Sequence, residues 1–114
     1  LFESAPLRIF PAARLLGMFA GAVPMALVSS GSRPGILQLL NRLGWGGYFD
    51  VVVTGEDTPN SKPDPSPYLL AAARLGIAPG EMAAFEDTEA GIESAKAAGM
   101  AVFNVSSNTS YPWP

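Results

Sequence analysis

The sequence predicts an α/β fold built on a parallel β-sheet, and two observations support this prediction. Short apolar runs of strand length alternate along the chain with longer segments that repeat apolar residues at helical spacing. The apolar runs are continuous, as expected for strands that are buried on both faces of a sheet. The chain has 114 residues, of which 48% are hydrophobic, and this is enough for one globular domain with one core. No internal repeat and no linker divides it.

The predicted elements follow one another in alternation after an initial helix. Apolar runs predict strands at residues 25–28, 49–54, 82–85 and 101–105, and helical spacing predicts helices at residues 11–19, 34–43, 64–75 and 89–98. Pro65 and Pro67 fall at the start of the third helix, where proline is tolerated. Thr88 is a predicted N-cap, and Gly76 and Gly99 are predicted C-caps. This order predicts right-handed connections between parallel strands.

The domain is expected to span residues 11–105. Its predicted core consists of apolar residues from the strands and the helices that cover them: Leu27, Val28, Ile36, Leu40, Val51, Val53, Leu70, Leu75, Phe85, Ile92 and Val102. Residues 106–114 are polar with two prolines, and we expect a frayed tail there. Residues 1–10 resemble the end of a preceding segment.

The composition excludes several classes of function. The net charge is −3 and no basic cluster is present, which argues against a nucleic-acid partner. The absence of cysteine removes thiol nucleophiles and thiolate metal sites, and the absence of histidine removes Ser-His-Asp catalysis and histidine-ligated zinc. No stretch reaches the roughly 20 apolar residues that span a membrane, and no signal peptide is convincing, so we expect a cytoplasmic protein without a membrane partner. Any catalysis must use carboxylates, hydroxyls, Lys62, arginines or backbone amides.

Polar groups follow three of the predicted strands, at or just beyond the carboxyl end of each. Ser29 and the three amides after it lie above a helix N-terminus, a pattern typical of an anion cradle. Lys62, beside a proline, is a point charge suited to phosphate. Glu86 and Asp87 end the third strand, and their oxygens suit a hard cation such as Mg²⁺. Taken singly, these features also fit an ordinary turn, a solvated surface lysine and two solvated acids.

Together these segments resemble the haloacid dehalogenase superfamily. The similar segments are VSSGS at 28–32, SKPDP at 61–65 with YLLAA at 68–72, and FEDTEAGI at 85–92. The most similar branch contains the β-phosphoglucomutase-like and phosphoglycolate-phosphatase-like enzymes, and the resemblance covers about residues 11–105. It implies a Rossmann-like parallel sheet with flanking helices.

The resemblance also implies roles for individual residues. Ser29 would hydrogen-bond the transferring phosphoryl group, with the Ser30 amide nearby. Lys62 would neutralise the phosphoryl group and the attacking carboxylate. Asp87 would ligate Mg²⁺ with Glu86 assisting. Such groups stabilise the charge of a phosphoryl-transfer transition state on a small phosphorylated metabolite.

The chain departs from the family at the catalytic centre. The family's nucleophile and general acid/base are two aspartates in a D-x-D-G-[TS] segment that ends its first strand, and no such segment occurs here. The aspartates of this chain are Asp50, Asp57, Asp64 and Asp87. The mobile cap domain is also missing, and residues 1–10 correspond to the connection from cap to core. The resemblance therefore implies an incomplete core, in which the missing strand belongs between the strand ending at Ser29 and the strand ending at Asp87.

Without that strand, its two neighbours either pair directly or remain apart. We expect a gap, because the helices and loops are shaped for five strands.

Three hypotheses for the function follow. The favoured one is the C-terminal portion of a Mg²⁺-dependent phosphatase or phosphomutase that forms an aspartyl-phosphate when complete; this portion alone would be inactive. The second is a non-catalytic binding or regulatory module of the same fold. The third is half of a split enzyme whose partner, the missing N-terminal half, supplies the first strand. Since the first residue is Leu1, we expect a processed product or a fragment. The substrate and the choice between phosphatase and mutase stay open, because cap residues select the substrate in this family.

Overall fold

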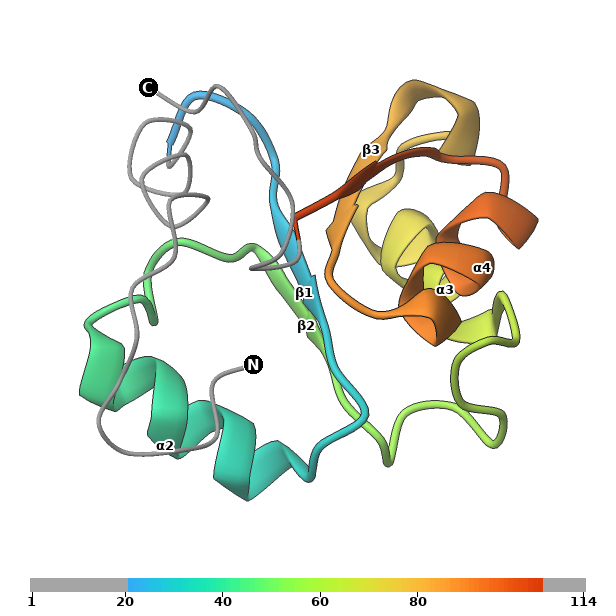
Figure 1. The fold of residues 1–114 in the computed structure, drawn as a ribbon. Coiled ribbons are helices and arrows are strands. Elements are labelled where there is room, and N and C mark those ends of the chain that lie inside the picture. The colour runs from blue at the N-terminus through green and yellow to red at the C-terminus, as the bar shows by residue number, and fades with distance from the viewer. Residues whose placement is uncertain (1–20, 106–114) are drawn as a thin grey trace.

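The computed structural model describes residues 21–105 (Figure 1). Its elements in order are β1 (Ala26–Val28), α2 (Arg33–Leu43), β2 (Val51–Val53), α3 (Ser66–Leu75), the 3₁₀ turn η1 (Pro79–Glu81), β3 (Ala83–Glu86), α4 (Glu89–Ala97) and β4 (Ala101–Asn104). The four predicted strands and three of the predicted helices are confirmed. The predicted helix at 11–19, the segment 1–10 and the tail 106–114 lie outside the described residues.

The strands form two parallel pairs. In the first pair Ala26 of β1 lies opposite Val51 of β2, and in the second pair Ala83 of β3 lies opposite Ala101 of β4. Among the described strands, the two pairs are separate sheets, and β1 does not pair with β3. The expected gap is therefore confirmed.

Helix ends are fixed by local hydrogen bonds. The Thr88 hydroxyl accepts a hydrogen bond of 3.0 Å from the Gly91 amide and caps α4, as predicted. The predicted C-cap Gly76 ends α3 at a φ of 71°, which a residue with a side chain rarely adopts. Helix α3 begins two residues later than predicted, since the Asp64 carboxylate accepts from the Ser66 amide and closes the turn before the helix.

Helix α3 joins the two halves of the domain. It contacts β1, β2 and α4, and α4 contacts both β3 and β4. In Figure 1, α3 and α4 lie together beside β3, and α2 stands apart from them. The buried cluster between these elements consists of Tyr68, Ala72, Ala84, Ala95, Ala98 and Met100. Within residues 21–105, no helix has the length and apolar content needed to cross a membrane.

The predicted core is only partly correct. Leu40 and Val53 are buried, and the other predicted core residues apart from Phe85 are half-buried. Phe85 is wrong, because it is 44% exposed. Successive side chains of β3 point to opposite faces, so Ala84 faces α4 while Phe85 faces away and stacks on Phe103 at 5.4 Å.

Candidate functional site

The Lys62 side chain contacts the carboxyl ends of strands from both pairs. Its ammonium group donates to the Val28 carbonyl at the end of β1 (3.1 Å) and to the Glu86 carboxylate at the end of β3 (2.6 Å). Ser29 and Ser30, which follow β1, line a cavity of about 120 Å³ together with Lys62. The structure therefore brings four of the five predicted site residues together, since Glu86 pairs with Lys62.

The Lys62 side chain is only 14% exposed, and the Glu86 side chain is 7% exposed. Their charges are removed from water together, and such a pair persists because each charge compensates the other. Tyr68 completes the arrangement: its hydroxyl donates to the same Glu86 oxygen, and Lys62 lies 5.4 Å from the centre of its ring. Burial, followed by the negative charge of Glu86, raises the pKa of Tyr68 above its ordinary value. Tyr68 is thus a neutral donor at this site.

Glu86 lies against the first turn of α4. A Cβ atom on Gly91 would come within 1.9 Å of Glu86 Oε1, so only glycine leaves room for the carboxylate. Since Lys62 and Tyr68 both bind Oε2, the carboxylate is held from two sides. Glu86 is therefore a fixed part of the site.

The predicted metal ligands are fewer than a cation site requires. Asp87 is half-buried directly after Glu86, at the end of β3. Among the residues that the structure describes, no group of three Asp, Glu, His or Cys side chains could hold a metal ion. Carboxylate oxygens suit Mg²⁺, which takes six ligands, but the residues described here supply only part of such a set.

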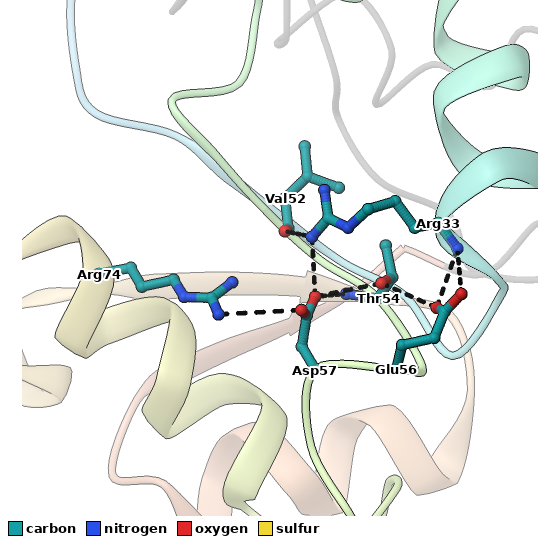
Figure 2. Close-up of polar contacts among 6 residues, drawn as sticks. All are labelled: Arg33, Val52, Thr54, Glu56, Asp57 and Arg74. Carbon is teal, nitrogen blue, oxygen red and sulfur yellow. Dashed lines mark hydrogen bonds and ion pairs between the residues drawn. The ribbon is translucent and has the colours of Figure 1, made fainter.

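The anion cradle is smaller than the sequence predicts. The Gly31 amide donates to Ser29 Oγ (3.1 Å) and is already satisfied. At the start of α2, the Arg33 amide donates to both Glu56 oxygens (2.9 and 3.1 Å), as Figure 2 shows, and the Gly35 amide donates to the cap residue Ser32. A carboxylate from the chain itself therefore occupies the positive end of this helix. Of the donors in the predicted cradle, the Ser29 hydroxyl and the Ser30 and Ser32 amides have no hydrogen-bond partner within residues 21–105.

Close contact of two loops forms the cavity. The Gly55 amide donates to the Gly31 carbonyl (2.8 Å). A Cβ atom on Gly55 would lie 2.5 Å from the Ser30 carbonyl oxygen, so a larger residue would push the loops apart. The loop after β2 supplies Thr58 and further polar residues to the same cavity.

A haloacid dehalogenase-like hydrolase family model matches residues 15–105, so the chain belongs to that family. The curated relatives include a phosphorylated carbohydrates phosphatase from Thermotoga maritima, 42% identical over 78 residues, which are 68% of this chain and 36% of that protein. They also include a phosphoglycolate phosphatase from Escherichia coli K12, 44% identical over 80 residues, which are 70% of this chain and 32% of that protein.

A solved structure from Thermotoga maritima, assigned as a β-phosphoglucomutase, superposes with a TM-score of 0.80 at 34% identity. The superposition covers 90% of this chain and 49% of that one. The predicted family and fold are therefore confirmed. The chain spans about a third of the length of the curated relatives that it matches and about half of the solved one.

Proposed function

We propose that this chain is the phosphate-binding portion of a phosphatase or phosphomutase that acts on small phosphomonoesters. The observation that carries the proposal is the position of Lys62, whose ammonium group lies beside the cavity lined by Ser29 and Ser30. The relatives described as phosphatases, and the solved structure assigned as a phosphoglucomutase, support the same class of reaction.

The described donors suffice to hold a phosphoryl group. An ammonium group has three N–H donors, and Val28 and Glu86 take two of the Lys62 donors. The third is then available to a phosphoryl oxygen, together with the Ser29 hydroxyl and the Ser30 amide. Because Lys62 is already fixed by two partners, it would need little reorganisation as charge develops on the phosphoryl group.

We infer that Mg²⁺ is the metal of the complete enzyme, and that Asp87 would ligate it with Glu86 nearby. The ion would neutralise phosphoryl charge. Lys62 and Tyr68 both donate to Oε2 of Glu86. Only its other oxygen, Oε1, would therefore be available as a metal ligand.

The nucleophile must come from outside the described residues. Asp50 accepts from the Met25 amide, Asp57 from the Thr54 amide, and Asp64 from the Ser66 amide and hydroxyl, so each of these carboxylates already has partners within the fold. The separation of the two strand pairs favours completion of the sheet by a further strand, supplied by the same polypeptide or by a partner. We propose that the aspartyl-phosphate forms on that strand and that the 114-residue chain alone does not turn over substrate.

The test combines an assay with a binding measurement on the purified chain. With p-nitrophenyl phosphate and Mg²⁺, we expect no turnover above background. In an NMR titration with orthophosphate, we expect shifts in the Ser30 and Lys62 resonances, and we expect Lys62→Ala to abolish the shift at Ser30. Lys96→Ala is the matched control, since Lys96 is exposed in the last turn of α4. Turnover that Lys62→Ala removes would contradict the inactivity, and orthophosphate shifts that Lys62→Ala leaves unchanged would contradict the phosphate site.

A further inference from the structure

The Asp57 carboxylate connects three segments of the fold (Figure 2). One of its oxygens, Oδ2, accepts from the Thr54 amide (2.6 Å), from the Thr54 hydroxyl (3.1 Å) and from Arg33 Nη2 (2.9 Å). Its other oxygen lies 3.8 Å from Arg74 Nη2 on α3. Asp57 therefore joins the end of β2 to the first turn of α2 and to the last turn of α3.

Arg33 and Thr54 extend these connections. The Arg33 atom that binds Asp57 also donates to the Val52 carbonyl of β2 (2.9 Å). The Thr54 hydroxyl also reaches Glu56 (3.1 Å), whose carboxylate closes the start of α2. Thr54 is 1% exposed, so its polar atoms depend on these partners for hydrogen bonds. The loop after β2 is thus fixed at its first four residues.

The same loop forms one wall of the cavity. Thr54, Gly55 and Thr58 line it on this side, and Ser29 and Ser30 line the other. The Gly55–Gly31 hydrogen bond holds the two walls in contact. Asp57 itself does not line the cavity, so any influence on a bound anion must act through the loop.

We propose that Asp57 is a positioning residue that holds the loop of residues 54–58 against α2 and thereby keeps the phosphate cavity preformed. This inference rests on the proposed function, in which the cavity takes a phosphoryl group. The ligand class is an inorganic phosphate or the phosphate of a small monoester.

Electrostatics alone predicts the opposite effect of removing Asp57. The substitution Asp57→Asn removes a negative charge and leaves Arg33 and Arg74 without their partner, so the region becomes more positive and should bind phosphate more tightly. A positioning role predicts weaker binding, because asparagine offers the loop one neutral acceptor oxygen in place of a charged carboxylate. The direction of the change therefore separates the two roles.

The experiment measures orthophosphate affinity of the 114-residue chain by NMR titration, well below its unfolding temperature. We expect Asp57→Asn to weaken binding about tenfold, the loss expected when a charge-assisted contact no longer holds the donors in place. Arg33→Lys keeps the charge and loses the planar contact with Asp57 and Val52, and we expect it to weaken binding about threefold. Glu93→Gln, on the exposed surface of α4, removes one charge without a recorded contact and should leave the affinity unchanged.

Hydrogen exchange provides a measurement that needs no ligand. In Asp57→Asn we expect the Gly55 amide to exchange about tenfold faster, while the Leu40 amide in α2 is unchanged. Unchanged or tighter phosphate binding in Asp57→Asn would overturn the proposal, and so would unchanged exchange at Gly55. If the wild-type chain does not bind orthophosphate, the proposed function fails, and the exchange measurement still decides the role of Asp57.

Discussion

The ion pair between Lys62 and Glu86 joins the loop that follows β2 to the end of β3, and so crosses from one strand pair to the other. Helix α3 connects the same two pairs, since it contacts β1 and β2 directly and packs on α4, which contacts β3 and β4. A charged contact and an apolar one therefore hold together two halves that no strand pairing connects among the described residues. The stability of the chain and the geometry of the candidate site depend on the same few side chains.

We expect Glu86→Gln to destabilise the chain by about 3 kcal/mol, because it leaves the Lys62 charge buried without its partner. The measurement is the free energy of unfolding in urea, followed by far-UV circular dichroism. Glu93→Gln is the control, as an exposed glutamate of α4. The double variant Lys62→Met with Glu86→Leu should recover part of the loss, since it removes both charges. Equal stability of Glu86→Gln and the control would show that the pair contributes nothing.

A methyl group at Gly91 should displace Glu86. Because the Cβ atom would lie 1.9 Å from the carboxylate, Gly91→Ala should cost about 1 to 3 kcal/mol although alanine favours a helix. Gly80→Ala is the matched control, since nothing lies within 4 Å of a Cβ atom there. Urea unfolding of both variants checks this, and a Gly91→Ala chain as stable as Gly80→Ala would contradict the tight fit.

The placement of the site could be predicted from the sequence because it follows from topology. Ser29 and Glu86 end apolar runs, and parallel strands bring their carboxyl ends to one edge of the fold. Lys62, beside a proline in a loop between two such strands, also fits a solvated surface lysine, and the resemblance to the haloacid dehalogenase superfamily implies its role at the site. The ends of these helices could also be predicted, since threonine and glycine are common capping residues, as Thr88 and Gly76 are here.

The burial and the contacts that the sequence did not predict depend on the direction in which individual side chains point. A continuous apolar run does not indicate which face is buried, so Phe85 was assigned to the core in place of the small Ala84. Tyr68 looks like one more apolar residue of a helix, and only its position in the first turn of α3 brings its hydroxyl to Glu86. Glu56 lies in a loop with no periodicity, and the residues around it do not indicate that its carboxylate accepts from the first amide of α2.

Mg²⁺ should bind the isolated chain weakly. Asp87 and Glu86 are adjacent, but no group of three potential metal-ligating side chains forms within residues 21–105. Titration calorimetry should therefore give a dissociation constant weaker than micromolar, and adding the missing strand, within one chain or as a second one, should strengthen binding. Micromolar or tighter affinity in the wild-type chain would refute this, and Asp87→Asn identifies whether any observed binding is at this site.

Stability should fall in acid. The Thr54 amide, with help from Arg33, lowers the pKa of Asp57 below its ordinary 3.8 although burial opposes this. The Ser66 side chain and amide lower the pKa of Asp64 in the same way. A lowered pKa in the folded state stabilises the fold above the ordinary value, and this contribution is lost as the pH falls through the folded pKa.

The thermal midpoint should therefore respond little to these two groups between pH 6 and about 4.5, and then decrease toward pH 3. Asp57→Asn should show a shallower decrease than Glu93→Gln, which keeps both carboxylates. A midpoint that rises as the pH falls below 4, or the same acid dependence in both variants, would contradict the assignment.

The last prediction concerns association of the isolated chain. The two strand pairs are not joined by strand pairing among the described residues, and Phe85 and Phe103 lie stacked on one face of the second pair, 44% and 46% exposed. Large exposed apolar side chains beside separate two-stranded sheets favour pairing with another chain. We therefore expect a chain of marginal stability that self-associates at tens of micromolar, measured by light scattering.

Phe103→Lys should reduce the association, because a charge opposes burial of that face, whereas Leu69→Lys, on the exposed side of α3, should not. A monomeric mass at these concentrations, together with a sharp cooperative thermal transition, would show that four strands and their helices suffice for a stable fold.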